Sequence, residues 1–131
     1  MSTMTREPLA ARFAEVTQLA NQGDFGPFMT LWAEDAVWIA GGDNPFSGRH
    51  RGHDEVRRWF ETMVGLGMQA EPLDVLEDDG HFVFFIRLHG QRGDKQLDQV
   101  HADAWTVTDG KFSGGFFLPG DQAAWDSFLR D

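Results

Sequence analysis

The segment from His101 to Val107 carries the residues of this sequence best suited to acid–base chemistry. His101, Asp103, Trp105 and Val107 alternate, and residues two apart on a strand point to the same face. Because Trp105 and Val107 are apolar, we expect this face to point into the fold. A carboxylate beside an imidazole of ordinary pKa near ~6.5 orients or protonates it for proton transfer. His101 is therefore the candidate acid–base group, and Asp103 either orients it or acts as a second acid. The competing interpretation is that the two are only a structural pair of neighbouring strand residues, at the open end of the strand or at a dimer face.

Arg87 and His89 form a second pair of polar residues on one strand face. They alternate with Val83 and Phe85, so they point either into a pocket or toward a dimer partner. In a pocket, their role would be to stabilise negative charge that develops on a substrate.

Aromatic residues are numerous enough to line a cavity for a flat or apolar ligand. The candidates are Trp32, Trp38, Trp59, Phe60, Trp105 and Phe116. The competing interpretation is that these side chains are ordinary core residues.

Metal and nucleotide cofactors are not predicted. His50 and His53 are three apart at a loop–helix junction, but no third ligand lies nearby in the sequence. The Gly-rich run at 41–52 lacks the Lys-Ser/Thr ending of a phosphate-binding loop. The chain has no cysteine, which excludes disulfides and thiolate metal sites.

The composition limits the classes of partner. A net charge of −10 disfavours binding to phosphate backbones, so nucleic acid is not expected. The longest apolar run, residues 82–86, is too short to cross a bilayer, and the N-terminus lacks an apolar signal core. We therefore expect a cytoplasmic protein that does not bind membranes.

Hydrophobic periodicity predicts one α+β domain over residues 1–131, with residues 1–7 flexible. Helices are expected over 8–22, from Asp24 through Trp32, and from His53 or Asp54 onward. A short strand is expected at 36–40, and 41–52 reads as a loop. Strands over 70–77, 81–90, 97–108 and 111–117 follow, with a turn at Asp109-Gly110 and a closing helix. A strand that is apolar on both faces, 81–90, predicts helices on one side of the sheet and a homodimer partner on the other.

Three segments give this pattern a family resemblance: "NQGDFGPFMTLWAEDAVW", "FSGRHRGHDEVRRWF" and "VHADAWTVTDGKFSG". They resemble the nuclear transport factor 2-like superfamily, in its SnoaL-like and ketosteroid isomerase-like branch, over about residues 8–130. The resemblance implies a cone-shaped, curved antiparallel sheet packed on N-terminal helices, a cystatin-like roll that opens to a small-molecule pocket. Family activities include isomerases, polyketide cyclases, dehydratases and epoxide hydrolases, besides binding modules, so the fold does not select one of them.

The ketosteroid isomerase template is incomplete in this chain. Its Asp base aligns with Ala40, its Tyr aligns near Val16, and the chain contains no tyrosine. Only Asp103 falls near the position of the second acid. The resemblance therefore implies Val16 as a pocket residue but does not imply steroid isomerisation by those groups.

Two other templates remain. The Asp–Arg–Asp set of limonene epoxide hydrolase is matched by Arg87, with His89 where the first Asp would stand and Asp121 as a later acid. SnoaL-like cyclases and dehydratases use His and Asp in the cone, which His101 and Asp103 provide. We therefore expect a cofactor-independent acid–base enzyme acting on a small apolar or aromatic metabolite, with non-catalytic binding of a hydrophobic ligand as the alternative.

Overall fold

A six-stranded sheet frames the protein, which is described from a computed structural model covering residues 2–130, with side chains described from Leu9 onward. The strands are β1 (Trp32–Ala40), β2 (Gly48–Arg51), β3 (Gln69–Asp78), β4 (His81–Arg92), β5 (Lys95–Thr108) and β6 (Lys111–Leu118). Their order in the sheet is β2-β1-β6-β5-β4-β3. Neighbouring strands are antiparallel except for β1 and β6, which run parallel.

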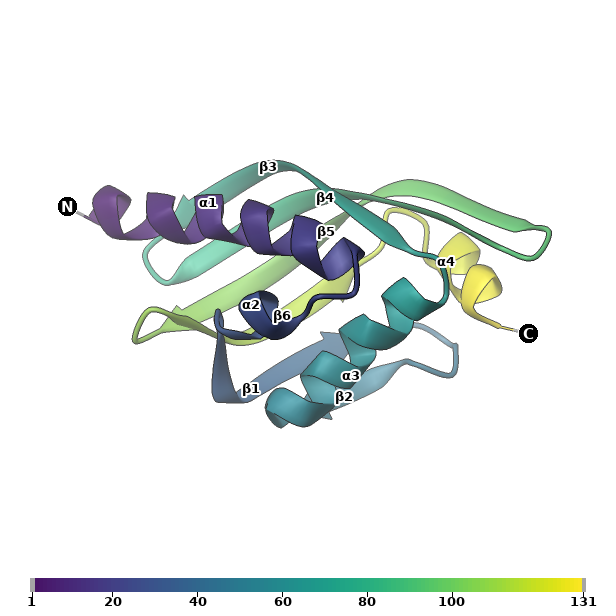
Figure 1. The fold of residues 1–131 in the computed structure, drawn as a ribbon, viewed down its shortest axis with the longest axis horizontal. Coiled ribbons are helices and arrows are strands. Elements are labelled where there is room, and N and C mark those ends of the chain that lie inside the picture. Colours follow the sequence, from purple (N-terminus) through teal and green to yellow (C-terminus); the bar gives the residue numbers. More distant parts are fainter. Residues whose placement is uncertain (1, 131) are drawn as a thin grey trace.

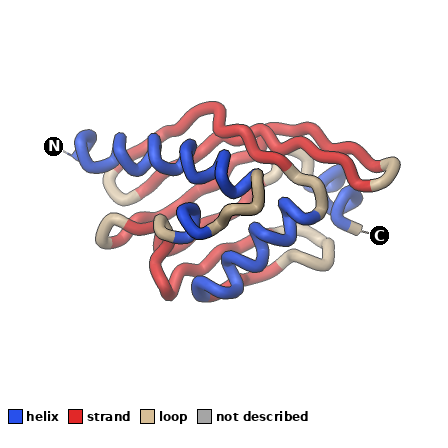
Figure 2. The backbone as a smooth tube through the Cα atoms, viewed as in Figure 1, coloured by secondary structure: helices blue, strands red, loops and turns tan. Residues whose placement is uncertain are grey.

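Four helices pack on this sheet: α1 (Ser2–Asn21), α2 (Gly26–Met29), α3 (Gly52–Gly65) and α4 (Gln122–Leu129). Figure 1 shows α1 lying along β3 and β4, and α3 lying along β1 and β2. The helix α4 lies at one end of the sheet, against β5. Figure 2 shows that the sheet curves around α1, α2 and α3. The predicted α+β class and curved sheet are confirmed.

The strand β4 shows how the sequence distinguishes the two faces of the sheet. Phe82, Phe84 and Ile86 are buried beneath the helices, whereas the alternating Val83 and Phe85 are only partly buried. The ring of Phe13, on α1, stacks on Phe84 with 4.0 Å between the ring centroids. Apolar residues on the inner face therefore hold α1 to the sheet.

The hairpin between β5 and β6 forms at the predicted Asp109-Gly110 turn. Both residues have positive φ, 53° for Asp109 and 77° for Gly110, as a two-residue turn of type I′ requires. The turn pairs Thr108 with Lys111, and the pairing of β6 with β5 begins at this point.

Three predicted elements have different boundaries. The second helix is a single turn, Gly26–Met29, and Trp32 begins β1 rather than ending a helix. Within the predicted loop, Gly48–Arg51 forms β2 at the edge of the sheet. This strand has no alternating apolar residues and is defined by its pairing with β1. The backbone of α1 is helical from Ser2. The predicted flexibility of residues 1–7 stays a prediction, because Met1 lies outside the described residues and the side chains before Leu9 are not described.

The outer face of the sheet exposes large apolar side chains. Val100, Phe116 and Leu118 are about half exposed on β5 and β6, and Leu76 is exposed on β3. This is the face that the sequence assigned to a homodimer partner, and that assignment stays a prediction. Within the described part of the chain, no helix has the length and apolar character needed to cross a membrane.

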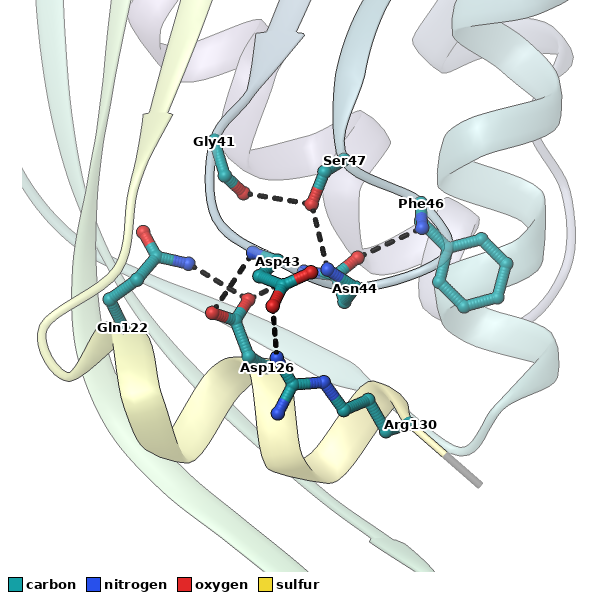
Figure 3. Close-up of polar contacts among 8 residues, drawn as sticks. All are labelled: Gly41, Asp43, Asn44, Phe46, Ser47, Gln122, Asp126 and Arg130. Atoms are coloured by element: carbon teal, nitrogen blue, oxygen red, sulfur yellow. Dashed lines mark hydrogen bonds and ion pairs between the residues drawn. The ribbon is translucent and has the colours of Figure 1, made fainter.

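A polar cluster fastens α4 to the loop between β1 and β2 (Figure 3). The carboxylate of Asp126 accepts hydrogen bonds from the backbone N–H of Asp43 at 3.1 Å, from the Asn44 amide at 2.7 Å and from Gln122 at 3.1 Å. Arg130 adds an ion pair to Asp43 at 2.8 Å. Burial would raise the pKa of Asp126, but the three hydrogen bonds outweigh it and hold this pKa below its usual value. We call this set of residues the α4 clasp.

Candidate functional site

A cavity of about 70 Å³ lies between the inner face of the sheet and the helices α1, α2 and α3. Its walls are mostly apolar and include Phe28, Phe60, Met63 and Ile86. The hydrophilic lining residues apart from tryptophan are Thr17, Asn21, His101 and Asp103. The site therefore combines a hydrophobic enclosure with a few placed polar groups, as small-molecule sites do.

His101 and Asp103 lie side by side in this cavity. The strand β5 directs both inward, opposite Ile86 and Phe84 of β4, and only 4% and 3% of their surfaces are exposed. Nε2 of His101 is 3.0 Å from Oδ1 of Asp103. Burial raises the pKa of Asp103, and the neighbouring imidazole only partly opposes that effect. The predicted inward orientation of the pair is confirmed.

Polar atoms of this pair remain available for a ligand. Among the described residues, Nδ1 of His101 has no hydrogen-bond partner. Oδ1 of Asp103 faces Nε2 of His101 at 3.0 Å and has no further hydrogen-bond partner among the described residues. Buried polar atoms without partners are costly to a fold, so each needs an explanation such as a catalytic role or a bound ligand. The pair therefore presents unused hydrogen-bonding capacity to the cavity.

Phe117 supports the imidazole, a role that the sequence interpretation missed. Its ring centroid lies 4.5 Å from that of His101 and 4.6 Å from that of Trp125 on α4. Direct counting from the Asp109-Gly110 turn places Phe116 opposite Asp103. A register shift between Thr106 and Val107 moves the pairing by one residue, so Phe117 faces Asp103 instead. A one-residue shift exchanges the faces of a strand, and Gly114 and Gly115 inside β6 are the residue signal for such a bulge that the sequence interpretation did not use.

The two remaining polar lining residues already bond within the protein. The Thr17 hydroxyl donates to the carbonyl of Phe13 at 2.7 Å. The Asn21 amide donates to the Ala70 carbonyl at 2.8 Å and accepts from the Ala70 N–H at 3.0 Å, which joins the end of α1 to β3. His101 and Asp103 are therefore the acid–base groups that this cavity offers.

The sequence of residues 10–114 matches the SnoaL-like domain. The chain belongs to the SnoaL-like family. A solved structure of Bal32a from a soil-derived mobile gene cassette is 28% identical, with a TM-score of 0.89, and the alignment covers 96% of this chain and 99% of Bal32a. The resemblance inferred from the sequence is therefore confirmed.

Two further solved structures share the fold of this SnoaL-like domain. A nuclear transport factor 2-like protein from Burkholderia xenovorans LB400 is 18% identical with a TM-score of 0.77, and 97% of each chain is covered. TerC, co-crystallised with polyporic acid, is 17% identical with a TM-score of 0.76, and the alignment covers 92% of this chain and 96% of TerC. A comparison with curated proteins gave no significant match.

Arg87 and His89 do not lie in the SnoaL-like cavity, so their predicted pocket role is wrong. Both alternate with the inward residues of β4 and lie on its outer face. Arg87 donates to Asp98 at 2.7 and 2.9 Å and forms an ion pair with Glu71 at 3.4 Å. Its hydrogen bonds and charge hold the pKa of Asp98 below the usual value. Arg87 is thus a cross-strand partner of surface carboxylates.

The predicted aromatic lining is correct for Trp59, Phe60 and Trp105 and wrong for the rest. Val16, Trp32 and Trp38 are buried in the core but do not reach the cavity surface, because other rings stand in front of them. Trp105, for example, lies 4.2 Å from Trp32 and 4.9 Å from Trp38 between ring centroids. Phe116 is 52% exposed on the outer face.

The remaining histidines and Asp121 have structural contacts. Nε2 of His50 lies 3.0 Å from the carbonyl oxygen of Phe46, and Nε2 of His53 lies 2.9 Å from that of Trp32. Asp121 caps α4 by accepting from the N–H of Ala124 at 3.0 Å, so it is not an acid of the cavity. Among the described side chains, residues 9–130, no three or more His, Asp or Glu form a cluster suited to a metal ion.

Proposed function

We propose that this SnoaL-like protein is an isomerase-type enzyme that moves a proton within a small, mostly apolar substrate. The observation that carries the proposal is the buried pair of His101 and Asp103, 3.0 Å apart in an apolar cavity with unused hydrogen-bonding atoms. A pair of titratable groups in an enclosed cavity is suited to proton transfer near neutral pH.

His101 is the proposed general base. With the Nε2 proton directed toward Asp103, Nδ1 carries the lone pair and takes a proton from a carbon next to a substrate carbonyl. The ring then becomes positive, and the carboxyl group of Asp103 stabilises that charge. Return of the same proton to a second carbon restores the imidazole and leaves an isomerised product, without net gain or loss of protons.

Trp105 is the proposed hydrogen-bond donor to the substrate oxygen. Its indole N–H is buried without an acceptor among the described residues, and its side chain lines the same cavity. A donor held in an apolar enclosure stabilises an enolate oxygen more than the same donor in water does. This assigns to Trp105 the role that the sequence gave to Arg87 or His89.

Binding without catalysis is the second candidate function, favoured by the apolar walls and by the internal bonds of Thr17 and Asn21. A relative of the same fold, TerC, was co-crystallised with polyporic acid. In this candidate, the cavity holds an apolar ligand and His101 only orients it.

The deciding experiment uses a β,γ-unsaturated ketone with one six-membered ring, whose conversion to the conjugated enone is followed by ultraviolet absorbance. We expect turnover by the wild type and a loss of about a hundredfold or more in kcat for His101→Gln, since general bases contribute roughly 10²–10⁴-fold. Trp105→Phe is expected to lower kcat while keeping the ring. Binding of the saturated ketone without turnover of the enone precursor, and without deuterium exchange next to the carbonyl, would instead establish the binding protein.

A further inference from the structure

A second depression lies on the outside of the protein, between the β1–β2 loop and α3. It has a volume of about 310 Å³, and its lining includes Phe46, His50, Arg58 and Trp59. Trp59 lines this outer groove and also lines the inner cavity that holds His101. It is the residue shared by the two linings, so we take its side chain as the boundary between them.

One hydrogen bond and contacts with neighbouring rings hold Trp59 in that position. Its Nε1 donates one hydrogen bond to the carbonyl of Phe46 at 3.1 Å. Its ring contacts Phe60 at 5.0 Å, Trp38 at 5.5 Å and Phe117 at 5.6 Å between centroids, and only 5% of the residue is exposed. The ring is therefore packed among aromatic side chains, and one hydrogen bond joins it to the β1–β2 loop.

The inner cavity and the outer groove, on the two sides of Trp59, differ in volume. The inner cavity measures about 70 Å³, and the groove on the other side of Trp59, which is open to solvent, measures about 310 Å³. A smaller side chain at position 59 would therefore add space from the groove to the cavity that holds His101.

We propose that Trp59 is the specificity-determining residue of this site. It excludes fused-ring and multi-ring molecules from the inner cavity and limits the substrate to an apolar compound of one ring or less. Without the indole, the groove and the inner cavity form one continuous pocket that extends from Arg58 to His101. The inference rests on the proposed function, because it concerns the substrate of that same cavity.

The test compares ligand size in Trp59→Ala and the wild type. N-phenyl-1-naphthylamine serves as the multi-ring probe, followed by its fluorescence, and phenol as the one-ring probe, followed by calorimetry. We expect Trp59→Ala to bind the naphthylamine at least about tenfold more tightly than the wild type, with one site per chain. The affinity for phenol is expected to change by less than about threefold.

Two control variants define what this gain means. Trp125→Ala removes an equally large buried ring that lines neither the cavity nor the groove, so it should not gain affinity for the naphthylamine. Trp59→Ala combined with Ala70→Leu refills the inner cavity from β3 and should lose the gain. If Trp59→Ala does not fold, Trp59→Leu replaces it as the smaller truncation.

Three results would overturn the assignment: equal binding of the naphthylamine by the wild type, an equal gain in Trp125→Ala, or a gain that survives Ala70→Leu. The proposed reaction is judged separately, by wild-type turnover of the one-ring enone precursor. Turnover without a size effect at Trp59 removes only this inference. If Trp59→Ala changes the size of ligand that binds but the wild type shows no turnover, Trp59 remains the residue that limits ligand size in a binding protein, and the proposed enzyme activity is rejected.

Discussion

Oδ1 of Asp126 lies 2.7 Å from the side-chain nitrogen of Asn44, a residue 82 positions earlier in the chain. This hydrogen bond is the centre of the α4 clasp, and α4 in turn places Trp125 against Phe117, which supports the ring of His101. The α4 clasp is thus linked through two aromatic rings to the candidate catalytic pair.

Asp126→Ala is expected to destabilise the fold by about 1–3 kcal/mol, because it leaves Asn44, Gln122 and the N–H of Asp43 without their acceptor. The pKa of Asp126 is lowered in the folded state, so its contribution is present above pH ~4 and is lost as the pH falls through the folded pKa. Urea unfolding of both proteins should show a difference that shrinks below pH ~4. Ser127→Ala, an exposed change on the same helix, is the control; a pH-independent difference would contradict the clasp.

Gly42→Ala is expected to weaken the same clasp. Gly42 has φ of +99°, and a Cβ there would collide with the side chains of Gln122 and Asp126. The conformation alone costs an alanine about 1–2 kcal/mol. Gly41→Ala is a close control, since its Cβ would meet nothing within 4 Å. Thermal unfolding should separate the two variants, and equal melting temperatures would show that Gly42 is not constrained.

Much of the fold could be predicted because its signals are local. The Asp109-Gly110 turn, the alternation through Trp105 and the helical spacing of Phe13 and Val16 each depend on nearby residues. β2 could not be predicted in this way, since Gly48–Arg51 forms a strand by pairing with β1 rather than by burying a face.

The site was only partly predictable, because its geometry depends on contacts between distant segments. His101 and Asp103 follow from alternation, and the face of β5 is set by Trp105. Arg87 and His89 have the same alternation on β4, but the opposite face of that strand is apolar from Phe82 to Leu88, a local signal for the covered face that the sequence interpretation did not use. Asn21 lies at the cavity because it bonds to Ala70, 49 residues away in the sequence, and such a contact is not visible in a local pattern.

Phe117→Ala is expected to cost about 3–5 kcal/mol, as truncation of a buried aromatic ring does, whereas Phe116→Ala should cost less. The register shift between Thr106 and Val107 is the reason, since it turns Phe117 inward and leaves Phe116 about half exposed. Chemical denaturation of the two variants measures the contrast. An equal or larger cost for Phe116→Ala would contradict the register of β6 against β5.

Phe116→Arg tests the predicted homodimer through the outer face of the sheet. If two chains pack through this face, sedimentation equilibrium of the wild type should give twice the mass of one chain. A charged side chain beside Val100 and Leu118 should then shift the mass toward a single chain, because an arginine is costly in an apolar contact. Glu77→Arg, an exposed change near the β3–β4 turn, is the control. A wild type with the mass of one chain would exclude the homodimer.

Asp103→Asn is expected to change how stability depends on pH. Burial raises the folded-state pKa of Asp103 above the unfolded value of about 3.9, so its favourable contribution is complete below pH ~4 and is lost as the pH rises through the folded pKa. Asparagine has nearly the same shape and no such titration. The stability of Asp103→Asn relative to the wild type should therefore increase as the pH rises from ~4 toward neutrality, measured by urea unfolding. Asp74→Asn, an exposed carboxylate on β3, serves as the control, and a difference that is constant with pH would show that Asp103 keeps an ordinary pKa.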